Sequence, residues 1–213
     1  MKKNTKQEYL RRYTNIPSLI DILKNKKITL LDPITWDDRN DSYFIEQYKI
    51  KSKLKAVLCL CFTGRGETYH HWKVFSEGPS GICIVFNKKK LLKNIRHSNG
   101  FEYETIKYMT LNKLKANNIT IPNMPFVKRQ PYKDEKEFRI IYKDKKNSIR
   151  YKHVDIDLNC IDKVILSPWV PDALIDPLRK TIKSFNKEHR VRVWKSTLIS
   201  NENWKNIGES ITN

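Results

Sequence analysis

The sequence predicts an α+β fold: a single domain over residues 1–213 with seven or eight short strands and about four helices. Short apolar runs of strand length recur along the chain, and amphipathic stretches with helical spacing stand between some of them. The two kinds of element follow one another in mixed order, without the strict alternation that builds a parallel sheet. The sheets are therefore expected to be mixed and mostly antiparallel.

The first regular element is predicted to be a helix from Asn15 to Asn25. Asn15 is suited to cap it and Pro17 to stand in its first turn. Apolar residues then follow at helical spacing: Leu19, Ile22 and Leu23. A short strand is predicted at 28–31, and the polar stretch 35–41, which surrounds one tryptophan, is predicted to be a loop.

The other elements follow from apolar runs and from alternation. Continuous apolar runs predict buried strands at 56–62, 81–86 and 161–166. Partly exposed strands are predicted at 101–105, 137–142, 149–154 and 191–198, with 137–142 and 149–154 paired as a hairpin. Helices are predicted at 71–77, 88–98, 111–117 and 171–186, and the proline-rich stretch 121–131 is predicted to be a loop.

The charge of the chain favours a polyanionic partner. The formal net charge is +19 and the pI is about 9.7, which suits nucleic acid, although a composition rich in Lys, Asn and Ile accounts for part of the excess. Between positions 87 and 153 there are 18 Lys and Arg residues against 6 Asp and Glu residues. The alternative is that each basic run is a solvated turn. The candidate phosphate contacts are Lys88, Lys89, Lys90, Lys128, Arg129, Lys143, Lys145 and Lys146.

The cysteines and the hydropathy pattern indicate an intracellular protein. The four cysteines form no C-x-x-C pair and are expected to be buried and reduced, and no ligand spacing indicates a metal site. No run is long and apolar enough to span a membrane, and the basic start lacks the apolar region of a signal peptide. A cytoplasmic protein without membrane contact is the expectation.

Glu135 and Glu137 are the first candidate site. They stand two positions apart at the start of an apolar strand, so they are predicted to project from the same face. Two like charges on one face repel, and each is expected to seek a cation or a proton. The alternative is an ordinary solvated strand face in which these glutamates pair with nearby cations such as Arg139.

Three further clusters carry polar or aromatic groups suited to binding. Arg12 and Thr14 stand beside the predicted start of the first helix, where a phosphate or a ribose would bind well, or they belong to an exposed basic terminus without a ligand. The acidic residues of 37–41 could bind Mg²⁺, as a nuclease requires, or could form turns around Arg39. Thr63 ends a buried strand shortly before a run of aromatic residues that includes Trp72, whose ring could stack on a base or a nicotinamide or merely cap the core.

The order of these motifs resembles a broad bacterial family of domains of unknown function, over most of the chain. The matching segments are 12–14, the loop 32–41, Cys61-Phe62-Thr63, Trp72 with Phe75, 81–86, and the E-x-E-x-R motif at 135–139. The loop departs from the family pattern because Asp38 to Asp41 lacks the proline and phenylalanine that usually follow.

More distantly, the plan is similar to that of ADP-ribosyltransferases, in particular those that modify nucleic acid. This resemblance implies a split sheet and NAD as a substrate. Arg12 and Thr14 would then hold NAD, with Thr63 beside them, and Tyr13 or Trp72 would stack on the nicotinamide. Glu137 would accept the ribose hydroxyl and stabilise the oxocarbenium-like centre, and Glu135 would orient or deprotonate the acceptor.

Three hypotheses follow for the function. The first is an intracellular ADP-ribosyltransferase-like enzyme that modifies nucleic acid, as a defence or toxin effector whose antitoxin or other partner is unknown. The second is a metal-dependent nuclease that uses Asp38, Asp41, Glu135 and Glu137. The third is a nucleic-acid-binding module without catalytic activity, which would leave the two glutamates far from Arg12 and Trp72.

Overall fold

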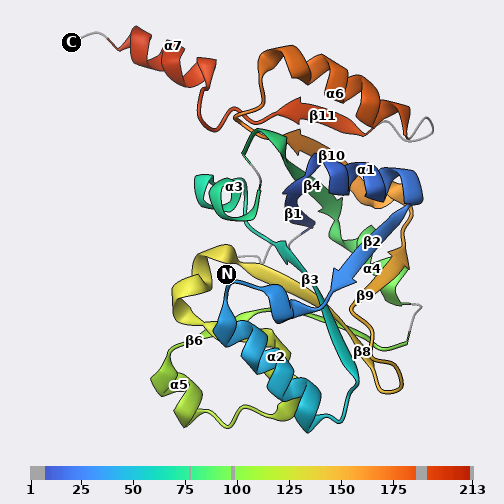
Figure 1. Cartoon of the computed structure of the whole chain (residues 1–213). Helices are drawn as coiled ribbons and strands as arrows, with labels where there is room; N and C mark the ends of the chain where they lie inside the picture. Colours follow the sequence, from blue (N-terminus) through green and yellow to red (C-terminus); the bar gives the residue numbers. More distant parts are fainter. Residues whose placement is uncertain (1–7, 77, 97–98, 186–190, 212–213) are drawn as a thin grey trace.

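The computed structural model describes residues 8–76, 78–96, 99–185 and 191–211. Within them lie a large sheet, a two-stranded sheet and seven α-helices (Figure 1). The large sheet comprises β1 (Tyr9–Asn15), β2 (Lys27–Leu31), β3 (Ala56–Thr63), β4 (Gly81–Asn87), β5 (Phe101–Thr105), β8 (Glu137–Asp144), β9 (Tyr151–Asp155), β10 (Ile161–Leu166) and β11 (Arg192–Lys195). The small sheet pairs β6 (Lys107–Met109) with β7 (Val127–Arg129).

The helices cover both faces of the large sheet and its ends. They are α1 (Ile16–Asn25), α2 (Arg39–Lys51), α3 (Tyr69–Phe75), α4 (Lys88–Arg96), α5 (Leu111–Ala116), α6 (Asp172–Ser184) and α7 (Glu202–Ser210). Two short 3₁₀ helices matter for the site: η1 (Pro33–Thr35) and η4 (Gln130–Glu135). In the described parts of the chain, no helix has the length and the apolar composition needed to cross a membrane.

The pairing confirms the predicted class of a mixed, mostly antiparallel sheet. In the large sheet, β10 and β11 run parallel and the other pairs are antiparallel. One edge of β3 pairs with β8 along its whole length. The other edge pairs with β1 at Thr63 and with β2 at Cys59. The sheet therefore splits at β3, as predicted, into one arm that continues through β1 and another that continues through β2.

Five local predictions were wrong. The stretch 121–131, predicted to be a loop, contains a 3₁₀ helix over Ile121–Phe126 and the strand β7, which pairs with β6. The described residues contain more elements than expected, with nine strands in the large sheet alone. Residues 9–15 form a strand because they pair with β4 along their length. The predicted hairpin does not form, because β3 and β5 occupy the two edges of β8 and β9 pairs with β2. The predicted loop at 35–41 contains the start of α2, which Asp38 caps. The predicted helix end at Asn186 lies outside the described residues.

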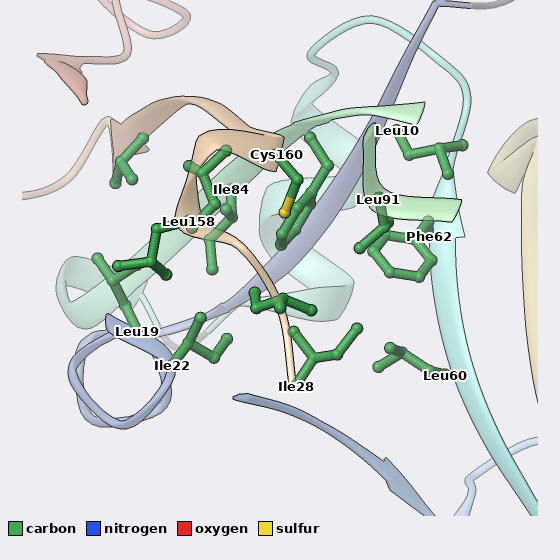
Figure 2. Packing of buried hydrophobic residues seen from close by; sticks show 14 of the residues in the cluster. Leu10, Leu19, Ile22, Ile28, Leu60, Phe62, Ile84, Leu91, Leu158 and Cys160 are labelled. Atoms are coloured by element: carbon green, nitrogen blue, oxygen red, sulfur yellow. The ribbon is translucent and has the colours of Figure 1, made fainter. Parts of the chain in front are cut away.

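The main core lies between the sheet and helices α1, α4 and α6. Figure 2 shows Leu19 and Ile22 of α1 near Leu158 and Ile28, with Cys160 and Phe62 in the same cluster. Full burial of each such aliphatic side chain stabilises the fold by about 1.5–3 kcal/mol. Of the cysteines, Cys59, Cys83 and Cys160 are buried, Cys61 is half-buried and all are free, which confirms the expectation of reduced thiols.

A second cluster of buried residues holds α2 against the opposite face of the sheet. Along β3, Leu58 and Leu60 belong to the main core, whereas Val57 and Cys59 belong to the second cluster together with Ile45 of α2. The strand is therefore covered on both faces, as its continuous apolar run predicts. Side chains alternate between the two faces of a strand, and Cys61, Glu137 and Arg139 stand at positions of the same face as Cys59 and Ile141. These polar groups therefore project toward α2.

Candidate active site

A cavity of about 510 Å³ opens beside the point where the sheet splits. Its wall combines segments that are far apart in sequence: β1, the end of β3, α3, the turn between η1 and α2, and the stretch from β7 to β8. The lining residues are Arg11, Arg12, Tyr13, Thr35, Trp36, Asp37, Asp38, Cys61, Phe62, Thr63, His71, Val74, Phe75, Lys128, Tyr132, Glu135 and Glu137. Arg12 of β1 and the glutamates near β8 thus share one cavity, whereas Trp72, the third group that the enzymatic hypothesis expected to converge there, is not among its lining residues.

Three neighbouring strands form the floor of this cavity. Arg11 of β1 lies opposite Thr63 of β3, which in turn lies opposite Glu137 of β8. Adjacent strands are separated by about 4.8 Å, so the backbones of β1 and β8 are about 10 Å apart. A cationic strand and an acidic strand therefore flank the cavity.

The acidic side of the cavity is a buried cluster of five charged residues. Arg139 is fully buried, and its guanidinium donates through Nε and Nη2 to Glu137, at 2.7 and 3.1 Å. It also donates to both oxygens of Asp41, at 2.9 and 2.5 Å, and to the carbonyl of Pro125 at 2.8 Å. These bonds use all of the donors that an arginine carries. The guanidinium also lies 5.0 Å from the ring of Trp36.

Lys128 completes the cluster by standing between the carboxylates. Its Nζ is 2.7 Å from Glu135 Oε2, 3.4 Å from Glu137 Oε2 and 3.6 Å from Asp41 Oδ2. The sequence predicted a cation or a proton between the two glutamates, and Lys128 supplies that cation. Because three carboxylates face two cations, the cluster carries a net charge of −1 beside the cavity.

The environments of Glu135 and Glu137 move their pKa values in opposite directions. Burial opposes ionisation of Glu137, but Arg139 and Lys128 outweigh it and lower its pKa to about 2. Burial raises the pKa of Glu135 above its ordinary value, against the opposing effect of Lys128. Two carboxylates whose pKa values are pushed apart are suited to two different roles, one as a permanent anion and one as a proton acceptor.

The backbone of Glu135 is fixed by two side chains of the cavity wall. Its carbonyl accepts a hydrogen bond of 2.5 Å from Thr63 Oγ1, and His71 Nε2 lies 3.2 Å from the same oxygen. Lys136 follows with a φ of 46°, in the left-handed region. Glu135 therefore lies in η4, before the strand, and this sharp bend, not a shared strand face as predicted, brings it to Lys128 beside Glu137.

We expect Thr63→Val to lower the free energy of unfolding by about 1–3 kcal/mol, because it removes a donor from the buried Glu135 carbonyl. It also removes the acceptor of the Arg65 N–H, which donates to Thr63 Oγ1 at 3.0 Å. Denaturant titration measures the change. Thr105→Val is the matched control, since Thr105 is exposed on β5, and it should change stability little. Equal effects of the two substitutions would contradict this role of Thr63.

An aromatic wall stands on the α3 side of the cavity. The rings of Tyr13 and His71 are stacked with centroids 5.4 Å apart, and Phe75 lies 5.8 Å from His71. His71 is buried, and this burial lowers its pKa, so the imidazole is neutral at physiological pH. Its Nδ1 lies 2.6 Å from Thr68 Oγ1, and the Nε2 proton then points toward the Glu135 carbonyl.

Two predicted NAD contacts, Trp72 and Thr14, do not line the cavity. Trp72 has no exposed surface and packs edge-on against Tyr13, with centroids 5.1 Å apart. It belongs to the core because α3 turns it toward β4, leaving His71 and Phe75 on the cavity side. Thr14 lies one residue beyond the lining part of β1, opposite Ile82 of β4. Arg12, Tyr13 and Thr63 do line the cavity.

Arg12 is a cation without an acidic partner. Its Nη1 donates to the Cys61 carbonyl at 3.3 Å, and among the described residues no carboxylate pairs with it. Burial lowers the pKa of its guanidinium, since the charged form loses hydration that no ion pair replaces. A partly buried guanidinium that points into a cavity without a counter-ion is suited to an anionic ligand.

The predicted phosphate contacts are spread over the molecule. Lys128 is a correction, because its ammonium is buried among three carboxylates and is not available to a phosphate. Lys88 lies 4.2 Å from the Phe138 ring, and Lys143 pairs with Glu102. The other predicted contacts are exposed and lie outside the cavity: Lys89 and Lys90 on α4, Arg129 on β7, and Lys145 and Lys146 after β8.

The geometry disfavours the nuclease hypothesis. Asp41, Glu135 and Glu137 are already paired with Lys128 and Arg139, so the place that a divalent cation would take is held by an ammonium group. In residues 8–76, 78–96, 99–185 and 191–211, no group of three or more His, Cys, Asp or Glu residues is arranged to hold a metal ion. Asp38 instead caps α2, with Oδ1 accepting from the N–H groups of Asn40 and Asp41.

The sequence reasoning did not assign several residues of the site. Trp36 and Tyr132 were not predicted as cavity residues, His71 was considered only as part of the aromatic run next to Trp72, and Asp41 only as a metal ligand or as part of a turn. A tryptophan in an otherwise polar segment was the one sequence feature that could have indicated Trp36. The sequence suggested an ion pair between the glutamates and Arg139 only as part of a solvated strand face, whereas Glu137 and Arg139 form their ion pair in the buried interior.

No family model matches the chain. A rat protein (Rattus norvegicus), NLR family CARD domain-containing protein 4, is 31% identical over 93 residues, which cover 41% of this chain and 9% of that protein. The chain thus matches less than a tenth of the length of this curated relative.

Similar solved structures include DarT of Thermus sp. 2.9. Its complex with carba-NAD+ has a TM-score of 0.46 and 12% identity, with 90% of this chain and 96% of that chain covered. Its complex with ADP-ribosylated ssDNA has a TM-score of 0.47 and 13% identity, with 89% and 94% covered. The site in this chain is defined by its own contacts and not by these structures.

Proposed function

We propose that the protein is an ADP-ribosyltransferase that takes NAD as its substrate and transfers ADP-ribose to a nucleic acid. The observation that carries this proposal is the shared cavity, in which an unpaired guanidinium and a buried acidic cluster flank the same floor of three strands. The cation suits the pyrophosphate of NAD. The acidic cluster suits the positive charge that develops when the nicotinamide leaves.

In the proposed binding mode, Arg12 pairs with the pyrophosphate and the aromatic wall of Tyr13, His71 and Phe75 packs against the nicotinamide. The nicotinamide ribose then lies near Glu137. Since Arg139 fixes both oxygens of Glu137, the carboxylate needs no reorganisation during the reaction. A preorganised charge of this kind lowers the barrier to a charged transition state.

The proposed reaction has two bond changes. The bond between C1′ of the ribose and the nicotinamide nitrogen breaks, and its electron pair stays with the nicotinamide, which becomes neutral. The carbon develops oxocarbenium character opposite Glu137, whose low pKa keeps it ionised. A nucleophilic atom of the acceptor then bonds to C1′, and its proton passes to Glu135, whose raised pKa makes it the better base of the pair.

The direct test is incubation of the purified protein with NAD labelled in the adenylate portion and with single-stranded DNA or RNA. Label should appear on the nucleic acid while free nicotinamide is released in equal amount. Label that stays on NAD under all conditions, or cleavage of the oligonucleotide that a chelator abolishes, would refute the proposal. The role of a defence or toxin effector stays a prediction from the sequence, and growth arrest on expression would test it.

We expect Arg12→Gln to weaken NAD binding by about 10- to 100-fold, since a charge-assisted hydrogen bond contributes about 1.5–3 kcal/mol. Calorimetric titration with NAD measures the change. Arg192→Gln is the matched control, because Arg192 pairs with Asp162 on the exposed edge of the same sheet. If the Arg12 variant binds NAD as tightly as the control, the pyrophosphate does not lie at Arg12.

A further inference from the structure

A second cavity, of about 410 Å³, lies on the other side of the segment that leads into α2. The two cavities share this segment as a wall. Pro33, Ile34 and Arg39 line the second cavity, whereas Thr35 to Asp38 line the candidate active site. Lys55, directly before β3, and Arg150, directly before β9, also line the second cavity.

One face of α2 lines this second cavity. Arg39, Ser42, Tyr43, Glu46 and Lys49 follow at helical spacing and all line it. The adjacent face of the helix carries Asp41, which belongs to the acidic cluster of the active site. The helix therefore contacts the acidic cluster on one side and a basic cavity on the other.

The charges of the second cavity favour an anion. Lys49 is paired with Glu46 at 2.6 Å, and Asp32 caps η1 by accepting from the Ile34 N–H at 3.0 Å. Arg39 donates to the carbonyl of Ile34 at 3.1 Å. Within the part of the chain that the structure describes, no carboxylate pairs with Arg39, Lys55 or Arg150. Three cations without counter-ions thus converge on one concave surface.

We infer that this cavity binds the phosphodiester backbone of the single-stranded nucleic acid that accepts ADP-ribose. Arg39, Lys55 and Arg150 contact successive phosphates, and the ring of Tyr43, which is 61% exposed, offers a stacking surface to a base. A strand anchored here crosses the shared wall, so a neighbouring nucleotide reaches Glu135. The assignment of the strand as the acceptor rests on the proposed function, whereas the binding site itself does not.

The test measures binding of a fluorescent single-stranded oligonucleotide to the intact protein by anisotropy, at several salt concentrations and without NAD. The double substitution Lys55→Glu/Arg150→Glu should weaken binding by at least about tenfold. It should also make the salt dependence shallower, because each phosphate contact on a single strand contributes about 0.7 to the slope of the logarithm of the binding constant against the logarithm of the salt concentration. Lys55→Gln/Arg150→Gln should give a smaller loss in the same direction. Lys113→Glu/Lys115→Glu on α5 is the control with the same change in net charge, and its residues are exposed.

Equal weakening by the α5 control would overturn the site, because the effect would then be one of net charge. Binding of a mononucleotide or of inorganic phosphate as tightly as the oligonucleotide would also overturn it in favour of a small-anion site. NAD binding, measured separately by calorimetry, should be the same in the double variant and the wild type. A third outcome separates the two proposals. If the wild type binds the oligonucleotide but not NAD, and the double variant binds the oligonucleotide weakly, the proposed function is refuted and the nucleic-acid site is retained.

Discussion

Glu137→Gln is expected to reduce both NAD cleavage and ADP-ribose transfer by about 100- to 1,000-fold, the loss typical when one preorganised electrostatic group is removed from an active site. The substitution keeps the shape of the side chain but removes the charge that faces the developing cation. Because Glu137 is buried and its pKa is lowered to about 2, the wild-type residue is ionised throughout the usual working range of pH. Release of nicotinamide from NAD measures cleavage, and labelled ADP-ribose on the oligonucleotide measures transfer.

The comparison with Glu135→Gln separates the two glutamates. Loss of Glu135 should reduce transfer more than cleavage, since this residue acts on the acceptor and not on the leaving nicotinamide. Glu209→Gln, on the exposed helix α7, is the control for the chemical change and should keep wild-type rates. Retention of NAD binding by Glu137→Gln, measured by calorimetry, shows that the cavity is intact. A wild-type rate of NAD cleavage by Glu137→Gln would contradict the proposed mechanism.

Arg139→Met is expected to destabilise the protein by about 3–5 kcal/mol, the usual cost of breaking a buried ion pair from one side. The substitution leaves Asp41, Glu135 and Glu137 buried with Lys128 as their remaining cation. Denaturant titration at pH 7 measures the loss. Arg192→Met is the matched control, because it breaks the ion pair with Asp162 on the surface, where such pairs contribute about 0–1 kcal/mol.

The pH dependence distinguishes a charge effect from a packing effect in Arg139→Met. In the wild type, the pKa of Glu137 falls from an ordinary 4.5 to about 2 on folding. Its contribution to stability is therefore present above pH 4.5 and is lost as the pH falls toward 2. Without Arg139, burial raises the pKa of Glu137, so a lower pH protonates the buried carboxylate and removes part of the cost of the substitution. The difference in the free energy of unfolding between the wild type and the variant should therefore narrow from pH 7 to pH 4. A difference that stays constant would indicate that lost packing, not charge, explains the effect.

Local patterns in the chain were sufficient for the class of fold and for most single elements. The buried strand at 56–62 and the helix that Asn15 caps were predicted because the spacing of apolar residues and the capping of a helix depend on neighbours in sequence. The strand at 9–15 and the helix at 39–51 were not predicted. β1 is stabilised by pairing with β4, and α2 is stabilised by packing on β3 and β8. Both depend on contacts that no local pattern records.

By itself, the sequence determined that Glu137 and Arg139 share a face, because strand parity is local, and it predicted that Glu135 and Glu137 need a cation. Only the tertiary structure decided that Lys128 is this cation and that Asp41 joins it. It also placed Arg12 on the same cavity and left Trp72 in the core. The physical reason is that a charge is stabilised by whichever groups the fold brings within a few ångströms. In this chain those groups come from α2, β7 and β8, which are separated by up to 98 positions in sequence.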